Sequence, residues 1–400
     1  MKTITDKNRI EEIFNRGVVV DVLPSKEEFI KKLQSGERLK IYIGADATSN
    51  SLHLSHAKNY MFLEELRQLG HEVVVLFGDF TAQIGDPTGK NAARPQLSAV
   101  EIKKNVKNWL KQIKPLMNFA DKVNPPKIAY NSKWLSKLTL SDVIKLASNF
   151  TVQQMIERDM FEKRWNENVP IYLHEFLYPL MQGYDSVAMN VDVELCGTDQ
   201  TFNALAGRLL QKRLNNKDKY VVTVNLMANP KTGALMSKSQ GTGVFLSSPA
   251  NEMYGAVMAQ PDEMIEVLFV NVTRIPLSEK KAILDLGPRD AKAKVALEIV
   301  KKFYGEKKAL AAQAAFVSQF SKGELPEDIE VKTLPAGSQL ISGVIAATMG
   351  ISKSEARRLI AQGGVKIDSE VVKADGNLEI GKKEILFQVG KRRFVKIKAE

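Results

Sequence analysis

The chain has a single cysteine, Cys196, among its 400 residues. One cysteine cannot form an internal disulfide, and it excludes every zinc site that needs several thiolates. No apolar run approaches the roughly 18 residues that a membrane-spanning helix needs, and the charged first ten residues do not resemble a secretory signal. We therefore expect a cytoplasmic protein that has no membrane association and no protein-bound structural metal.

Histidine is almost as rare as cysteine, with four in the chain. Two of them, His53 and His56, follow a β-rich segment at 40–43 and a turn of small polar residues, and they begin a helical pattern that ends at Gly70. A strand that turns into a helix N-terminus presents unpaired backbone N–H groups to an anion, and two imidazoles can add hydrogen bonds to phosphate oxygens. The segment is a candidate phosphate site. Alternatively, the two histidines only cap the helix.

A second candidate phosphate-binding segment is LMSKSQG at 235–241. Its hydroxyl and backbone N–H groups can hold a phosphate while Lys238 supplies positive charge. On its own, the segment is equally consistent with a solvent-exposed loop.

Acidic residues are in deficit, with 46 Asp and Glu against 57 Lys and Arg. The last 64 residues carry a net charge of +5 and the other 336 a net charge of +6, so positive charge is densest at the C-terminal end. There, Ser352 to Glu355 form a capping-box pattern, and Lys353 and Arg357 share a helix face. No apolar face accompanies them, which favours RNA over a membrane as the partner. A solubilising surface is the other interpretation.

The first half of the chain alternates strand and helix patterns, as in a parallel α/β sheet. The apolar run at 72–80 indicates a strand buried on both faces. Ligands of open α/β sheets bind at the carboxyl ends of the strands, where the turn before His53 and the polar turn at 85–90 would lie. We predict a Rossmann-like catalytic domain at 1–245, with a helical insertion at about 100–170. An α-helical domain at 246–322 and a linker at 323–337 would follow, and a small α+β RNA-binding domain would occupy 338–400.

Five motifs in order resemble those of bacterial tyrosyl-tRNA synthetases, which are class I aminoacyl-tRNA synthetases. They are Tyr42-x-Gly44-x-Asp46-x-Thr48 leading to His53-Leu-Ser-His56, GDPTGK at 85–90, Tyr178 to Asp185, Gly197 to Gln200, and Met236 to Ser239. The resemblance covers nearly the whole chain, and the C-terminal region is similar to the small RNA-binding domain of ribosomal protein S four. It implies ATP-dependent activation of L-tyrosine, transfer to the 3′ end of tRNA(Tyr), an anticodon-binding role for 246–322, and a homodimer.

The resemblance also implies a role for each matching residue. The catalytic residues, which contact the ATP phosphates or the pyrophosphate leaving group, are His53, His56, Lys90, Arg94 and Lys238. The tyrosine-binding residues are Tyr42, Asp86, Tyr178, Gln182, Asp185 and Gln200. The ATP-binding residues are Gly44, Asp46, Thr48, His53, His56, Gly197, Asp199, Met236, Ser237, Lys238 and Ser239. The RNA-binding residues are Lys353, Arg357 and Arg358.

The expected chemistry agrees with this set of side chains. A carboxylate that attacks the α-phosphorus of ATP is already ionised, so the reaction needs positioning and positive charge rather than a protein nucleophile. Mg²⁺ would enter with ATP, held by its phosphates rather than by a protein cage. In the tyrosine pocket, Tyr42 and Asp185 would bind the phenol hydroxyl, and phenylalanine would leave both unpaired.

Three positions depart from the family pattern. Ser55 replaces the glycine between the two histidines, Leu235 replaces the first lysine of the KMSKS signature, and Cys196 replaces a glycine. Lys231 is a candidate substitute for the missing lysine. The alternatives that remain open are a tryptophan-specific relative, a synthetase-like RNA-binding protein with weakened catalysis, and a small-molecule adenylyltransferase.

Overall fold

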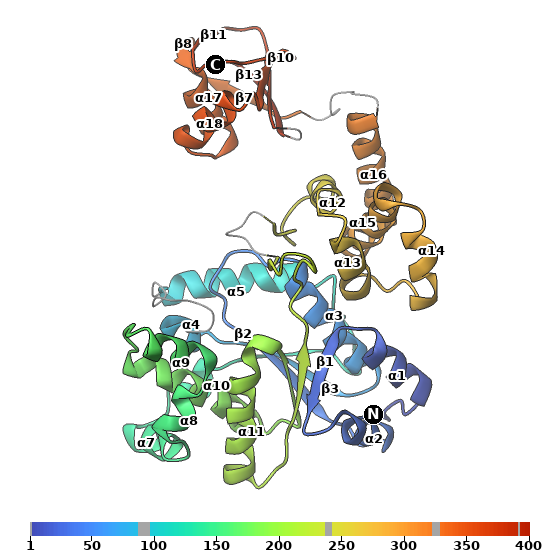
Figure 1. Cartoon of the computed structure of the whole chain (residues 1–400), viewed down its shortest axis with the longest axis vertical. Helices are drawn as coiled ribbons and strands as arrows, with labels where there is room; N and C mark the ends of the chain where they lie inside the picture. The colour runs from blue at the N-terminus through green and yellow to red at the C-terminus, as the bar shows by residue number, and fades with distance from the viewer. Residues whose placement is uncertain (1, 87–96, 237–241, 322–328, 391–392) are drawn as a thin grey trace. The chain divides into compact units, whose positions relative to one another are not determined.

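The computed structural model describes residues 2–86, 97–236, 242–321, 329–390 and 393–400 (Figure 1). The chain divides into two compact units, Met1–Gln313 and Ala314–Glu400, and each is described by itself. Within the described residues, no helix combines the length and the apolar character needed to cross a membrane.

A six-stranded sheet lies at the centre of the first unit (Figure 1). Its strands, in spatial order, are β1 (Val19–Leu23), β6 (Tyr220–Val224), β5 (Val193–Gly197), β2 (Lys40–Ala45), β3 (Glu72–Phe77) and β4 (Lys127–Tyr130). Only the β1–β6 pair is antiparallel. The four inner strands are buried along most of their length, as expected for strands that are covered on both faces. The predicted Rossmann-like α/β fold is confirmed.

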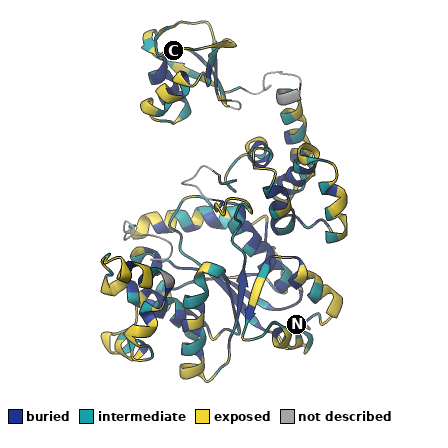
Figure 2. Cartoon of the chain, viewed as in Figure 1, coloured by how far each residue is buried: buried dark blue, intermediate teal, exposed yellow. Residues whose placement is uncertain are grey.

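Three long helices pack closely around the inner strands. Helix α3 (Leu54–Gln68) packs on β2 and β3, whereas α11 (Thr201–Asn215) packs on β5, β6 and α10 (Leu173–Met189). The shorter or more peripheral helices are α1 (Lys7–Asn15), α2 (Lys26–Gln34), α4 (Thr81–Ile84), α5 (Ala99–Ile113), α6 (Ser132–Leu135), α7 (Leu140–Ala147), α8 (Val152–Ile156) and α9 (Asp159–Asn166). The inner helix faces and the strands are buried, and the outward faces are exposed (Figure 2).

The segment at about 100–170, predicted as a helical insertion, contains the strand β4 besides its helices. This edge strand pairs in parallel with β3 through Val74 to Phe77. It is only four residues long and follows Pro125 and Pro126, so the sequence shows no clear alternating pattern there. The segment therefore completes the sheet as well as covering it.

A helical group follows the sheet in sequence and packs onto it. Its members are α12 (Ala250–Met258), α13 (Met264–Val272), α14 (Lys280–Leu284), α15 (Pro288–Tyr304) and α16 (Glu306–Ser321). Helix α13 packs against α3, and the buried Arg16 donates to the carbonyl oxygens of Val270, Thr273 and Ile275 at 3.0 Å each. These contacts join the end of α13 to α3 and to the end of α1 within one unit.

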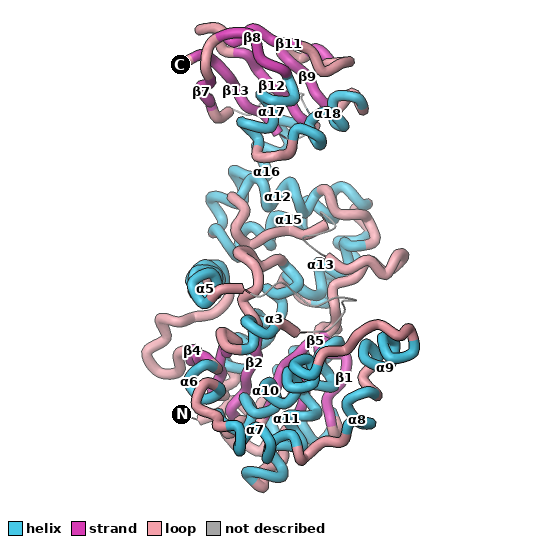
Figure 3. The backbone as a smooth tube through the Cα atoms, turned by 90° about the vertical axis from the view of Figure 1, so that its left-hand side faces the viewer, coloured by secondary structure: helices cyan, strands magenta, loops and turns pink. Residues whose placement is uncertain are grey.

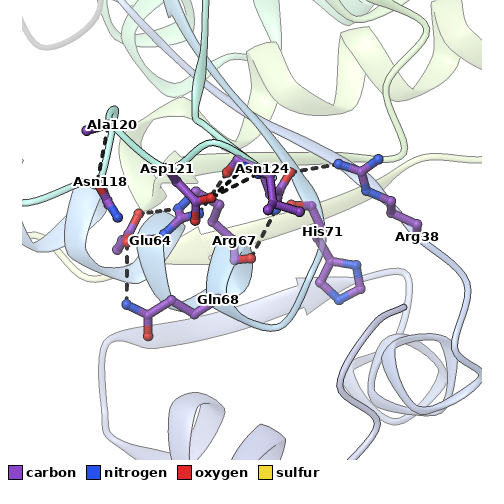
Figure 4. A network of polar contacts seen from close by, with 10 residues as sticks. Arg38, Glu64, Arg67, Gln68, His71, Asn118, Ala120, Asp121 and Asn124 are labelled. Atoms are coloured by element: carbon purple, nitrogen blue, oxygen red, sulfur yellow. Dashed lines mark hydrogen bonds and ion pairs between the residues drawn. The ribbon is translucent and has the colours of Figure 1, made fainter. Parts of the chain in front are cut away.

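A polar network fastens the loop after α5 to the amino-terminal edge of the sheet (Figure 4). Arg67 pairs with Glu64 at 2.7 Å and with Asp121 at 2.6 Å. The side chain of Asn124 accepts from Arg38 at 2.7 Å and donates to the carbonyl of Arg67 at 3.2 Å. We call these five residues the closed network, because Arg67 forms ion pairs with Glu64 and Asp121 while Asn124 links Arg67 to Arg38.

The second unit is a small α+β domain. Helices α17 (Ile341–Met349) and α18 (Lys353–Ala361) pack on one side of a sheet (Figure 3). Its strand order is β10 (Glu370–Val371), β9 (Val365–Ile367), β12 (Ile385–Val389), β13 (Arg393–Ala399) and β7 (Val331–Leu334), and a separate pair joins β11 (Asn377–Ile380) to β8 (Gly337–Leu340). Strand β7 lies within the predicted linker 323–337 but pairs with β13. Its sequence, VKTL, is short and does not alternate, and none of its four residues is buried, so it gave no strand signal.

Candidate active site

The principal cavity lies where the strand order of the sheet reverses. The chain continues from β2 to β3 and β4 on one side, while β5 and β6 lie on the other. Open α/β sheets bind ligands at this switch point, outside the carboxyl ends of the strands. The cavity has a volume of about 670 Å³. Its lining includes Tyr42, Gly44, Asp46, Thr48, His53, His56, Asp86, Tyr178, Gln182, Asp185, Gly197, Asp199, Gln200 and Met236, all of which the sequence predicts as site residues.

The other predicted site residues do not line this cavity in the described structure. Five lie outside the described residues: Lys90, Arg94, Ser237, Lys238 and Ser239. The three RNA-binding candidates lie on α18 in the second unit and are exposed. Arg357 pairs with Asp375 at 3.1 Å and Arg358 with Glu355 at 2.6 Å, both at the surface.

His53 and His56 lie at the N-terminus of α3, beside the end of β2. His56 Nδ1 accepts from the backbone N–H of His53 at 3.4 Å, and the two ring centroids are 4.0 Å apart. His53 Nδ1 is buried without a hydrogen-bond partner among the described residues. Burial lowers the pKa of His53 to about 4 and that of His56 to about 3. Both imidazoles are therefore neutral at pH 7 and offer hydrogen bonds rather than positive charge.

Asp46, at the end of β2, lies between two hydroxyl donors. It accepts from Tyr178 at 2.8 Å and from Thr81 at 2.7 Å. Gly78 makes this arrangement possible, because a Cβ atom there would lie 2.0 Å from Asp46 Oδ1 and 2.3 Å from Thr81 Oγ1. Asp46 thus lies beside Tyr178, a predicted tyrosine-binding residue, although the sequence assigns it to ATP. Thr81 was not predicted as a site residue, because it belongs to none of the motifs.

Asp86 forms a second acidic position in the cavity. It accepts from Gln200 Nε2 at 2.7 Å and pairs with Arg158 at 3.4 Å. Arg158 is buried, and its guanidinium group lies over the ring of Phe161. The Asp86 side chain is therefore oriented by contacts from two separate segments.

Tyr42 and Asp185 lie deep in the cavity and have partners within the protein. The Tyr42 hydroxyl is 3.0 Å from Ser186 Oγ, and Asp185 accepts from Trp134 Nε1 at 2.7 Å and Asn131 Nδ2 at 3.3 Å. Burial raises the pKa of the Tyr42 hydroxyl and of the Asp185 carboxyl well above their usual ranges. The sequence expectation that phenylalanine would leave both groups unpaired was wrong in that respect. Selectivity therefore depends on whether the hydrogen bonds that a ligand makes to these two groups are stronger than those the groups already make within the protein.

A buried ion pair behind the cavity supports two of its residues. Lys219 and Glu194 are in contact and almost fully buried. Glu194 accepts from Gln182 Nε2 at 3.1 Å, and Lys219 donates at 2.9 Å to Ser186, the partner of Tyr42. Neither charged residue belongs to a motif: Glu194 lies within β5 and Lys219 directly precedes β6. The pairing depends on the register of β5 and β6, which local patterns do not reveal.

The donor set of the described residues does not form a metal cage. No group of three or more His, Cys, Asp or Glu side chains in the described part of the chain could hold an ion. The cavity instead combines an acidic wall, at Asp46 and Asp86, with a neutral wall, at the two histidines and the start of α3.

Two family models match the chain. The model of the class I tRNA synthetases (W and Y) matches residues 34–321, and that of the S4 domain matches residues 344–380. The first match spans the sheet, the cavity and the helical group. The second falls within the small α+β unit.

Individual relatives agree with these matches over nearly their whole length. The chain is 41% identical over 392 residues to tyrosine–tRNA ligase of Francisella tularensis, covering 96% of this chain and 97% of that protein. It is 40% identical over 401 residues to tyrosine–tRNA ligase of Haemophilus influenzae, covering 99% and 98%.

Solved structures share the fold at lower identity. A C-terminally truncated mitochondrial tyrosyl-tRNA synthetase of Aspergillus nidulans has a TM-score of 0.66 at 22% identity, covering 78% of this chain and 94% of that chain. The tyrosyl-tRNA synthetase of Archaeoglobus fulgidus complexed with L-tyrosine has a TM-score of 0.61 at 21% identity, covering 77% and 100%. With the family models and the relatives, they show that the chain belongs to the tyrosine–tRNA ligase family of class I tRNA synthetases.

Proposed function

We propose that the chain activates L-tyrosine with ATP to form tyrosyl-adenylate and transfers the tyrosyl group to the 3′ end of tRNA(Tyr). The observation that carries the proposal is that one cavity joins two chemically different walls. The acidic wall suits an amino acid's ammonium group, and the N-terminus of α3 suits a phosphate chain. The two substrates of the first step would therefore meet at the switch point of the sheet.

The amino acid would bind along the acidic wall. Asp86, Tyr178 and Gln182 would hold the ammonium group, with Gln200 near the carboxylate. Asp46 supports this assignment through its contact with Tyr178, because a second carboxylate there strengthens the attraction for a cation.

The phenol hydroxyl would bind between Tyr42 and Asp185. Both groups are buried and polar, so a ligand hydroxyl at this depth can add a hydrogen bond to those they already make within the protein, whereas phenylalanine offers only carbon. This arrangement favours tyrosine over tryptophan.

ATP would bind across the start of α3. His53 and His56 would donate hydrogen bonds to its phosphates, together with Thr48, while Gly44, Asp46, Gly197, Asp199 and Met236 would surround the nucleoside. The tyrosine carboxylate forms a bond to the α-phosphorus as the bond to the pyrophosphate oxygen breaks. Lys90, Arg94 and the Ser237–Ser239 segment with Lys238 would stabilise the leaving group. Mg²⁺ would arrive as part of the ATP substrate.

The second unit would bind tRNA through the exposed basic face of α18. Lys353, Arg357 and Arg358 are exposed on this helix, and phosphate contacts by such residues bring affinity without reading bases. Ion pairs with Glu355 and Asp375 orient the two arginines in the free protein.

We also propose a homodimer that works in the cytoplasm. Exposed apolar side chains gather on α7, α8, α9 and the start of α10, which lie near one another in the first unit (Figures 1 and 2): Leu140, Ile144, Val152, Trp165 and Leu173. An exposed apolar surface of this kind marks an interface in a water-soluble protein. Sedimentation at micromolar concentration tests the assembly, and Leu173→Glu should shift it toward monomers.

The first half-reaction is tested by amino-acid-dependent exchange of labelled pyrophosphate into ATP. Tyrosine should drive exchange and tryptophan should not. Absence of exchange with every amino acid would favour an RNA-binding protein with weakened catalysis. Exchange that tryptophan drives better than tyrosine would assign the chain to the other specificity of its family.

The second half-reaction is tested by aminoacylation of tRNA(Tyr). Lys353→Ala should raise the KM for tRNA. It should also reduce the slope of log affinity against log salt concentration by about one, because one fewer counterion is released on binding. Pyrophosphate exchange should be unchanged. Lys332→Ala is a control in the same unit, since Lys332 bonds a carbonyl of its own domain. An equal effect of both variants would argue against a specific role for α18.

A further inference from the structure

Lys58 lies in the second turn of α3, two residues after His56. Its side chain is buried, with 2% of the residue exposed, although it is a lysine. It lines the principal cavity together with Asn59, and its Nζ donates to Asn59 Oδ1 at 2.7 Å. The ammonium group is therefore held beside the wall where the two histidines lie.

Lys58 has no carboxylate within ion-pair distance among the residues that the structure describes. Asp199, at the other side of the cavity wall, acts on it only at longer range, and burial lowers the pKa of Lys58 to about 7. A buried lysine without an ion pair lowers the stability of a folded protein. Lys219, also buried, has Glu194 in direct contact, so the two lysines form a natural comparison.

Lys58 is the only lysine or arginine among the described residues that line the cavity. The neighbouring imidazoles are neutral at pH 7, as shown above. Leu235 lines the same cavity with an apolar side chain at the position of the KMSKS signature's first lysine. Lys231, the candidate substitute, forms an ion pair with Glu263 and does not appear in the described lining.

We propose that Lys58 binds ATP: its ammonium group, held by Asn59 between His56 and Asp199, contacts the phosphate chain and supplies the charge that Leu235 does not. The proposal rests on ATP being the substrate of this cavity, as proposed above. An anion beside Lys58 favours its protonated form, so ATP binding should be accompanied by proton uptake near pH 7. The groups that face Lys58 and also titrate are His53 and His56 on α3 and Asp199 after β5.

The test compares Lys58→Met, Lys58→Arg and Lys219→Met in the full chain. Pyrophosphate exchange gives the KM for ATP and for tyrosine, and thermal unfolding at pH 6.5 gives Tm. We expect Lys58→Met to raise the KM for ATP by about tenfold or more, to leave the KM for tyrosine within about twofold, and to raise Tm. Lys58→Arg should retain most of the ATP affinity. Lys219→Met should lower Tm, because it leaves Glu194 buried and unpaired.

Calorimetry with α,β-methylene-ATP, in two buffers of different ionisation enthalpy at pH 7, separates this proposal from the enzymatic one. The wild-type chain should take up about half a proton on binding, and Lys58→Met should bind at least about tenfold more weakly with no uptake. A Lys58→Met chain with unchanged nucleotide affinity, or one whose Tm falls as in Lys219→Met, would overturn the proposal. If wild-type exchange is absent but nucleotide binding depends on Lys58, the proposed activity fails and this inference stands.

Discussion

Buried charged side chains have ion-pair partners at one end of the central sheet, and at the other end a buried lysine lacks one within the described part of the chain. At the amino-terminal edge, the closed network surrounds Arg67 with Glu64 and Asp121. At the carboxyl edge, Lys58 has no ion-pair partner among the described residues. Both ends are built on the same helix, α3, which begins beside the cavity and ends beside the closed network.

The difference shows how one helix serves stability and function at once. Its last turn has complementary charges, which hold the loop after α5 in place. Its first turns hold Lys58, whose buried ammonium group bonds Asn59 and has no carboxylate within ion-pair distance in the described structure. We call the end of α3 beside the closed network the closed end and the end beside the cavity the open end. Removing a partner should lower stability at the closed end and activity at the open end.

The largest expected effect lies at the closed end. Arg67→Ala should lower the free energy of unfolding by about 3–5 kcal/mol, because Glu64 and Asp121 would lose their shared cation. Urea denaturation measures this loss. Lys127→Ala is the control at the same edge: its ion pair with Glu72 is 61% exposed on the lysine side and should be worth less than about 1 kcal/mol. Equal losses in the two variants would contradict the assignment of Arg67 as the centre of the network.

At the open end, Gly78→Ala should act on catalysis more than on stability. The new Cβ atom would force Asp46 and Thr81 apart, and a displacement of about 1 Å in a positioning residue can cost about 100-fold in rate. We expect kcat/KM for tyrosine to fall by about that factor in the exchange assay. Gly343→Ala, where a Cβ atom meets nothing within 4 Å, should leave exchange unchanged. Normal kinetics in Gly78→Ala would show that Asp46 has no positioning role.

Asp185→Asn tests whether the buried carboxyl at the open end serves selectivity. The amide keeps the shape but replaces one oxygen by an NH2 donor, and a hydrogen bond is worth about 0.5–1.5 kcal/mol. The preference for tyrosine over phenylalanine should fall by up to about tenfold, while urea denaturation shows little loss of stability. Competition between the two amino acids in exchange measures the ratio. A ratio equal to that of the wild-type chain would remove Asp185 from the selectivity mechanism.

The sequence predicts the open end better than the closed end. Nine of the fourteen cavity-lining site residues lie at or after strand ends, at 44–56, 85–86 and 197–200, so strand ends and turn composition favour one edge of a sheet for them. The other five were assigned to the site by the family resemblance: Tyr42, Tyr178, Gln182, Asp185 and Met236. The resemblance also distributed all fourteen between two substrates.

What the sequence does not reveal depends on pairings between distant segments. Trp134 reaches Asp185 only because β4 is an edge strand of the sheet, and Lys219 reaches Glu194 only through the β5–β6 register. Arg67 looks like an ordinary surface residue of an amphipathic helix until the loop with Asp121 packs on it. Lys58 likewise looks exposed, since a lysine in a helix usually is.

The smallest effect that we predict compares one histidine from each end. His53 lies at the open end, and His71, at the closed end, accepts the backbone N–H of Leu39 at 3.2 Å. At pH 7, His71→Leu should cost about 1 kcal/mol, because it leaves that buried N–H unpaired, whereas His53→Leu should cost less. Burial lowers the pKa of both histidines to about 4.

Acidification then adds a second test to this pair. Between pH 6.5 and 4 the unfolded chain binds protons that the folded chain does not, so the wild-type free energy of unfolding should fall across this range. Each leucine variant removes one such histidine and should make the fall shallower, even though the two variants differ at pH 7. Urea denaturation at pH 7, 6 and 5 measures both properties. If the two variants are equally destabilised at pH 7, the hydrogen bond from Leu39 N–H to His71 adds no stability. The contrast between the two ends would then not extend to their histidines.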